Sequence, residues 1–318
     1  MRKVSAVASV LLLGLMLDVH TGFAQAYPSR PLRFVSSDIG GASDTAARLL
    51  AAHLSESWGQ AVVVENRNLT LGGQIVAQSS PDGYSALFSG STFWTEPLFQ
   101  KMPFDPAKDF APVTMVSSSP ALILVQPAFP AANVTELIAL AKSKPGQLNF
   151  GTASTGSSGH LAAELLKSMA GINIVRIQYK GASQSLTALM GGEVQMSFAS
   201  APSGMPYVKT GRLRALAVTS ARPSAVAPGI PTVASAGLPG YEVASSVGMF
   251  VVAKTSRNII TQLNRDVVRV LVRPDVKEKI LSLGSDVVAN SPEQFGSAMK
   301  SEVARIGKLV KEAGLRTE

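Results

Sequence analysis

Apolar and polar positions along this chain follow two patterns, one typical of strands and one of helices. The short apolar run Leu32–Ser36 predicts a strand, and within Thr45–Trp58 apolar residues recur at i, i+3, i+4 and i+8 from Ala46, which predicts a helix. The same criteria predict strands at Ala61–Glu65, Ser85–Ser89, Val113–Ser117, Ala121–Val125, Leu148–Thr152, Ile174–Tyr179, Val194–Ala199, Leu213–Thr219 and Gly248–Ala253. They predict helices at Thr135–Ser143, Leu161–Ala170, Ser183–Met190, Ile259–Val272, Val276–Leu283 and Pro292–Ala313.

Strands and helices are therefore expected to alternate, with a mainly helical end. The stretch from Leu32 to Glu65 is close to the ~30 residues of one strand–helix–strand unit. Such units join parallel strands through a crossover helix. The pattern predicts an α/β fold with mostly parallel sheets.

Two proline-containing segments mark places where the chain is expected to cross between lobes. Pro120 and Pro127 bracket the strand Ala121–Val125, and a stretch rich in proline and glycine from Pro223 to Gly240 precedes Gly248–Ala253. Two crossings predict a hinge and a cleft between two lobes, where ligands commonly bind. We expect lobe 1 to comprise residues 27–120 and 248–318, and lobe 2 to comprise residues 121–247.

The first 26 residues have the features of a secretory signal peptide. Arg2 and Lys3 precede an apolar run from Val4 to Leu17, and Ala24-Gln25-Ala26 places small residues where a signal peptidase cleaves. The alternative is a membrane anchor, but the run is shorter than the ~20 residues that span a bilayer. We expect cleavage before Tyr27 and a periplasmic product.

Composition narrows the possible chemistry. Of 318 residues, 46% are hydrophobic and 16% charged, which excludes global disorder. Cysteine is absent and histidine occurs three times, so disulfides, thiolate zinc sites and cysteine catalysis are excluded and no cofactor or metal is expected. The net charge is +8, but the basic residues are scattered among acidic ones such as Glu302 and Glu312. Nucleic acid is therefore not an expected partner.

Two turns rich in small residues each follow a predicted strand and open a predicted helix. The first contains Gly40-Gly41-Ala42-Ser43-Asp44, and the second runs from Gly151 to His160 with Thr152, Ser157 and Ser158. The first turn of a helix has unpaired N–H groups and a partial positive charge, so it binds carboxylate or phosphate. One such turn in each lobe predicts a clasp for a dianion. The alternative is that these serines and Asp44 are ordinary helix caps.

An enzyme is a second alternative. Ser157 or Ser158 with His160 is the only dyad that the mature chain offers, and it would suit a serine-dependent esterase. Neither serine lies in a G-x-S-x-G motif, and the chain has neither a P-loop nor a G-x-G-x-x-G motif after a strand. We therefore expect a binding protein.

Many short blocks resemble, in order, the receptors of tripartite tricarboxylate transporters, the Bug-type periplasmic solute-binding proteins. These blocks include Tyr27-Pro28-Ser29-Arg30-Pro31, Gly40-Gly41 with Asp44, Val63-Val64-Glu65-Asn66-Arg67, Pro81-Asp82-Gly83-Tyr84, Pro103-Phe104-Asp105-Pro106, Lys144-Pro145-Gly146, Gly156-Ser157-Ser158-Gly159-His160-Leu161, Tyr179-Lys180-Gly181, Gly211-Arg212-Leu213 and Gly237-Leu238-Pro239-Gly240-Tyr241. The resemblance extends along the whole mature chain.

The resemblance implies a two-lobed Venus-flytrap receptor that hands a small organic acid to membrane permease subunits and acts as a monomer. It also implies that the ligand-binding residues are Ser37, Gly40, Gly41, Ala42, Ser43 and Asp44 on one side and Thr152, Ser157 and Ser158 on the other. A sensor that docks on a membrane kinase would use the same lobe surfaces, so the docking partner stays open.

Three departures from the family pattern bear on the ligand. Ser36-Ser37-Asp38-Ile39 replaces a proline-rich run, and Asp38 places a negative charge near the expected anion site. Asn68-Leu69-Thr70-Leu71 replaces glycine-rich sequence, and Ala199 and Ser200 stand where a polar Asp or Asn is common. The far end of the ligand is therefore expected to meet a less polar wall.

Overall fold

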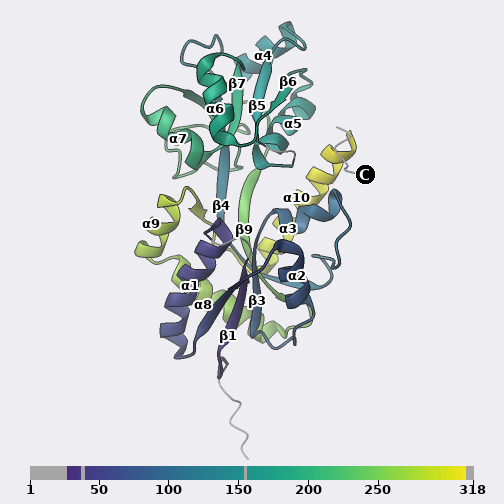
Figure 1. Ribbon diagram of the computed structural model, residues 1–318, viewed down its shortest axis with the longest axis vertical. Coiled ribbons are helices and arrows are strands. Elements are labelled where there is room, and N and C mark those ends of the chain that lie inside the picture. The colour runs from purple at the N-terminus through teal and green to yellow at the C-terminus, as the bar shows by residue number, and fades with distance from the viewer. Residues whose placement is uncertain (1–26, 37–39, 154–155, 313–318) are drawn as a thin grey trace, which may run out of the picture.

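The computed structural model describes residues 27–36, 40–153 and 156–312, and these form two lobes joined by a narrow waist (Figure 1). The strands are β1 (Leu32–Ser36), β2 (Val62–Asn66), β3 (Ser85–Gly90), β4 (Phe110–Val125), β5 (Asn149–Thr152), β6 (Val175–Gln178), β7 (Met196–Ser200), β8 (Arg214–Val218), β9 (Ala244–Val252) and β10 (Asp286–Val287). The helices are α1 (Ala42–Trp58), α2 (Leu69–Ala77), α3 (Thr92–Thr95), the 3₁₀ turn η1 (Glu96–Leu98), α4 (Val134–Ser143), α5 (Ser158–Ala170), α6 (Ala182–Gly191), α7 (Ala201–Lys209), α8 (Arg257–Leu271), α9 (Pro274–Ser282) and α10 (Pro292–Glu312).

The lower lobe in Figure 1 is built around the strand order β2-β1-β3-β9-β4. Helices α1 and α8 bury apolar faces against this sheet in one core, which includes Leu50, Leu54, Leu263 and Val267. A second core, rich in aromatic residues, contains α2, α3 and the first half of α10. Both faces of the sheet are covered, so the edges that carry the connecting loops are left for binding.

The upper lobe continues from the same strand β4 into the order β4-β7-β5-β6, with β8 also paired to β4. Helices α4 and α5 contribute to one hydrophobic core and α6 and α7 to another. The two-lobed α/β fold is confirmed. Among the helices in the described part of the chain, none combines the length and apolar character needed to cross a membrane.

Strands β4 and β9 carry the chain between the lobes. Residues Phe110–Pro120 of β4 pair with β9, whereas Ala121–Val125 pair with β7 and β8. Two separate strands were expected here, but the pairing continues through Pro120 into one long strand. The positions at which the lobes divide stay a prediction.

The expectation of mostly parallel sheets is wrong in detail, because the sheets are mixed. Strand β1 is parallel to β2 and β3, and β5 is parallel to β6 and β7. Strands β4 and β9 run antiparallel to their neighbours. The antiparallel pairs arise because two strands of opposite direction connect the lobes.

Helix α10 packs against both lobes. Phe295 and Met299 lie in the aromatic core of the lower lobe, and Ile306 and Leu309 lie in a core of the upper lobe. Figure 1 shows this helix rising along the waist towards α5, which it contacts. The helix is therefore a third structural link between the lobes.

Candidate functional site

The directions of the strands place both predicted turns on the sides of the lobes that face each other. Strand β9 is antiparallel to β4, β3 is antiparallel to β9, and β1 is parallel to β3, so β1 runs the same way as β4, towards the upper lobe. Strand β7 is antiparallel to β4 and parallel to β5, so β5 runs towards the lower lobe. Ligands of α/β proteins bind beyond the carboxyl ends of such strands. The turns that follow β1 and β5 therefore both lie at the waist.

The first turn presents the start of α1 without a side-chain cap. Gly41 is the N-cap residue and makes no side-chain hydrogen bond, and Ala42 is the first helical residue. The amide of Thr45 bonds to the Gly41 carbonyl, as a regular helix requires. The preceding helical amides are the ones that a bound anion accepts from.

Asp44 is a structural residue in this turn. Its carboxylate is buried and accepts from Gly40 N at 2.9 Å, Asn66 Nδ2 at 2.8 Å and Arg48 Nε at 3.0 Å. Burial alone would raise the pKa of Asp44, but these hydrogen bonds lower it below its usual value. Gly40 has φ +77, in the left-handed region that favours glycine. The hydrogen bond from its amide to Asp44 holds the turn in this conformation.

A small cavity of about 160 Å³ lies beside the first turn. Gly40 and Ala42 line it, together with Ser117 of β4 and Leu283 and Ser285 after α9. Ser43 is buried within the helix start. Ser37 and Asp38 lie outside the described residues, so the structure does not place them.

The second turn is capped by its own serine. Ser157 is the N-cap residue of α5, and its Oγ accepts from His160 N at 3.3 Å. Ser158 is the first helical residue and is partly exposed. A Cβ at Gly159 would collide with the Phe198 carbonyl oxygen, so glycine here lets α5 pack directly on β7. The predicted cap role of Ser157 is therefore realised, while its hydroxyl hydrogen stays able to donate.

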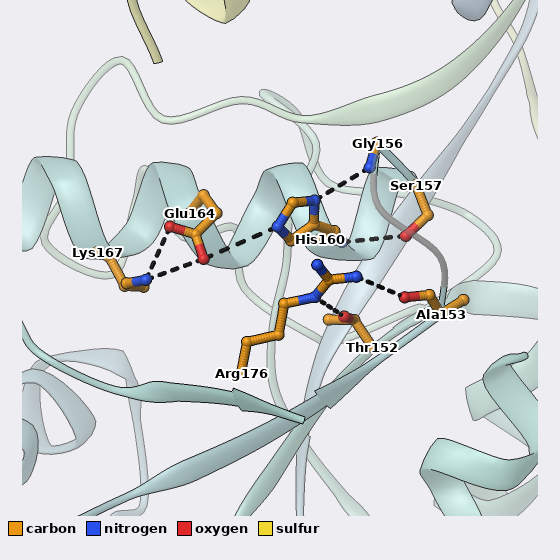
Figure 2. Close-up of polar contacts among 8 residues, drawn as sticks. All are labelled: Thr152, Ala153, Gly156, Ser157, His160, Glu164, Lys167 and Arg176. Carbon is orange, nitrogen blue, oxygen red and sulfur yellow. Dashed lines mark hydrogen bonds and ion pairs between the residues drawn. The ribbon is translucent and has the colours of Figure 1, made fainter. Parts of the chain in front are cut away.

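His160 is a buried neutral residue. Its Nδ1 accepts from Gly156 N at 3.1 Å, and its Nε2 lies 3.9 Å from Glu164 Oε1 (Figure 2). Burial, with Arg176 and Lys167 nearby, lowers its pKa to about 4. Because Nδ1 is occupied by a backbone amide and Nε2 faces a carboxylate, neither nitrogen can activate a serine hydroxyl. The esterase alternative is wrong.

Arg176 in β6 holds the second turn from below, and sequence reasoning missed it. Its Nε donates to Thr152 Oγ1 at 3.0 Å and its Nη2 donates to the Ala153 carbonyl at 3.0 Å (Figure 2). The buried hydroxyl of Thr152 is thus engaged by Arg176. The sequence does contain one indication of this role, a basic residue inside the predicted strand Ile174–Tyr179.

A short ion-pair network supports this arrangement. Lys167 Nζ lies 2.8 Å and 2.9 Å from the two carboxylate oxygens of Glu164, which is buried. Lys167 therefore balances the charge of Glu164 on the side of α5 away from the turn. Within the described residues, no cluster of three histidine, aspartate or glutamate side chains could hold a metal ion.

Comparisons with known proteins agree over nearly the whole chain. The sequence model of one family, described as "Tripartite tricarboxylate transporter family receptor", matches residues 46–315. BugT from Bordetella pertussis is 32% identical over 300 residues, which cover 92% of this chain and 92% of BugT. The solved structure of R. palustris Rpa4515 with adipate has a TM-score of 0.69 at 34% identity and covers 91% of this chain and 98% of that one. A TctC solute binding protein from Polaromonas, solved with no ligand, has a TM-score of 0.84 at 24% identity and covers 90% and 99%.

Proposed function

Because the chain belongs to the tripartite tricarboxylate transporter family of receptors, we propose that it captures a small dicarboxylate between its lobes and delivers it to membrane permease subunits. Receptors of this family bind solutes and are not enzymes. The observation that carries the proposal is the pair of helix starts, one in each lobe, at the facing ends of β1 and β5. Each offers backbone N–H groups to one carboxylate.

The adipate in Rpa4515 supports a dicarboxylate as the ligand class. The first turn would bind one carboxylate through the amides of Gly41, Ala42 and Ser43. Gly40 would shape the turn, because its amide already bonds to Asp44. A role for Ser37 stays a prediction from the sequence. The second turn would bind the other carboxylate through the amides and hydroxyls of Ser157 and Ser158. Asp44 and Thr152 would then act by fixing the two turns, because their side chains are already engaged.

The wall near the second turn favours a ligand with a plain carbon chain. Ala199 is buried and apolar, and Ser200 Oγ lies 2.9 Å from Ser203 Oγ, so part of its hydrogen-bonding capacity is already used. A ligand hydroxyl or amine would find few partners there, and an unpaired buried polar group costs about 1–3 kcal/mol. We infer a preference for unsubstituted dicarboxylates over hydroxy or amino acids.

We also infer that the mature receptor is a periplasmic monomer that begins at Tyr27. This residue is tied to the lower lobe, since its hydroxyl donates to the Gly83 carbonyl at 2.7 Å and its carbonyl accepts from Gln262 Nε2 at 2.6 Å. Cleavage before Tyr27 would leave these contacts intact.

Calorimetry on residues 27–318 with succinate, adipate, malate and butyrate tests this function. We expect adipate and succinate to bind more tightly than malate, and butyrate to bind weakly because it lacks the second carboxylate. Gly41→Val should abolish dicarboxylate binding, since its side chain blocks approach to the helix amides. Ser157→Ala should cost about 1–2 kcal/mol of binding free energy.

Binding of butyrate as tight as that of adipate, or unchanged adipate binding by Gly41→Val, would contradict the two-turn clasp. Delivery is tested separately with labelled adipate and vesicles that hold the permease subunits. Uptake should require the receptor, and uptake without it would refute the delivery role.

A further inference from the structure

A second hollow lies on the lower lobe, between α10 and the chain that follows η1. Its volume is about 750 Å³, within the range of ~300–1,000 Å³ that is usual for small-molecule sites. Apolar side chains form most of its walls, among them Trp94, Phe104, Phe110, Met299 and Val303. We call this hollow the α10 groove.

The walls of the α10 groove are held rigidly. The ring of Phe104 lies 5.4 Å from that of Phe93 and 5.6 Å from that of Phe110, centroid to centroid. Trp94 Nε1 donates to Glu302 Oε2 at 2.8 Å, which fixes the indole. A site whose side chains are already ordered loses little conformational entropy when a ligand enters.

Positive charge lies at the rim. Lys101 comes from the chain after η1 and Lys300 from α10, and both are exposed lining residues. Within residues 27–36, 40–153 and 156–312, no carboxylate lies at ion-pair distance from either ammonium. The acidic lining residue, Asp105, is 2.9 Å from Lys108, so its charge is balanced locally.

The groove is separate from the two helix starts. Its lining residues come from 94–112 and 296–304, whereas the turns lie at 40–44 and 152–160. The α10 groove also differs chemically from the two turns. Its apolar walls and positively charged rim suit a ligand with one anionic end and an apolar body.

We propose that the α10 groove binds an amphipathic monocarboxylate, a medium-chain fatty acid in chemical class, at a site distinct from the dicarboxylate clasp. The alkyl chain lies along the aromatic and methionine side chains, and the carboxylate meets Lys101 and Lys300. Burying the chain supplies the affinity, because each methylene group removed from water favours binding. The lysines select an anionic head group over a neutral one.

Trp94 gives a direct readout, because the sequence contains only two tryptophans, Trp58 and Trp94. In a Trp58→Phe protein, decanoate added below its micelle concentration should shift the Trp94 emission in a saturable manner. Decanol should bind more weakly. Raising the salt concentration should weaken decanoate binding and leave decanol binding unchanged, because salt screens the exposed lysines.

A matched pair of variants on α10 tests whether decanoate binds in the groove. Ala304→Glu adds a carboxylate at an exposed lining position one turn after Lys300, and should weaken decanoate binding about tenfold through charge repulsion and pairing with that lysine. Ser301→Glu adds the same charge at an exposed position of the same helix that does not line the groove, and should bind decanoate as the parent does.

Equal decanoate binding by both glutamate variants, or no saturable change in Trp94 emission, would overturn the proposal. Gly41→Val separates the two sites, because it should lose adipate binding and retain decanoate binding. Loss of decanoate binding in Gly41→Val would also refute a separate groove site. Failure of adipate to bind the parent would refute the clasp without affecting the groove.

Discussion

Single side chains fix the shape of both turns from beneath. In the first turn, the carboxylate of Asp44 takes up the Gly40 amide. In the second, the guanidinium of Arg176 takes up the Ala153 carbonyl. The two contacts differ in direction, because Asp44 accepts a hydrogen bond from a backbone amide and Arg176 donates one to a backbone carbonyl. Each of these backbone groups is therefore unavailable to a ligand. The remaining amides of the turn are held in a fixed geometry in which they can bind one.

At the residue scale, we predict that Arg176→Gln weakens adipate binding roughly tenfold or more. The change removes two charge-assisted hydrogen bonds that hold Thr152 and Ala153, and such bonds are worth about 1.5–3 kcal/mol each. Arg176→Lys should also bind weakly, because one ammonium cannot reproduce the two directed contacts. Calorimetry measures both.

Arg222→Gln is the matched control, since Arg222 is exposed in the upper lobe, and it should bind adipate as the parent does. Parent-like affinity in Arg176→Lys would show that charge alone matters at this position. Unchanged affinity in Arg176→Gln would exclude a positioning role.

The sequence predicts which residues form the turns, but it does not show which side chains are already occupied. Gly40, Gly41 and Ala42 are recognisable because small residues between a strand and a helix leave backbone amides accessible. The contact between Arg176 and Thr152 depends on the register in which β6 pairs with β5, and nothing local in either segment specifies that register. Whether the predicted residues contact a ligand stays a prediction.

At the element scale, α10 contacts both lobes through polar side chains, one of them the partly buried acid Glu302. Glu302 accepts the Trp94 indole N–H, and Arg305 on the same helix lies 3.5 Å from Glu242 of the upper lobe. Burial raises the pKa of Glu302 to about 7, and the hydrogen bond from Trp94 only partly opposes this. The folded protein therefore binds a proton at Glu302 more strongly than the unfolded chain does.

We predict that Glu302→Gln stabilises the protein at alkaline pH. The stability that the protonated acid contributes is fully present below pH 4.5 and is lost as the pH rises through about 7. Glutamine keeps the acceptor for Trp94 and carries no charge, so the variant should gain about 3 kcal/mol over the parent at pH 8 and match it at pH 4.5. Urea unfolding at both pH values measures this difference.

Glu278→Gln, at an exposed position of α9, should show no such dependence on pH. A Glu302→Gln protein that is no more stable than the parent at pH 8 would indicate that the carboxylate is well solvated.

Elements with a strong apolar pattern were predicted within a few residues, and the helices that were missed have a physical reason. Helix α2 contains Gly72 and Gly73, and α7 contains Pro202, Gly204 and Pro206, which all disfavour a helix in isolation. Tertiary contact outweighs propensity here. A Cβ at Gly73 would collide with the Phe104 ring, so the glycine that weakens the helix also permits its packing.

At the scale of the whole molecule, the lobes share two continuous strands and one helix, so a change of their angle bends only the waist. Strand β4 pairs with strands of both lobes, and α10 packs into a core of each.

We therefore predict that a dicarboxylate closes the lobes and lowers the radius of gyration in solution scattering. A compact chain of the 292 residues from Tyr27 to Glu318 would have a radius of about 19 Å, so the open receptor should start above this value and approach it on saturation with adipate. Adipate must bind the closed state more tightly for this shift to occur, because a ligand moves an equilibrium only by its differential affinity. Gly41→Val should keep the open radius in the presence of adipate. An unchanged radius at saturating adipate in the parent would mean that the two turns do not grip one ligand together.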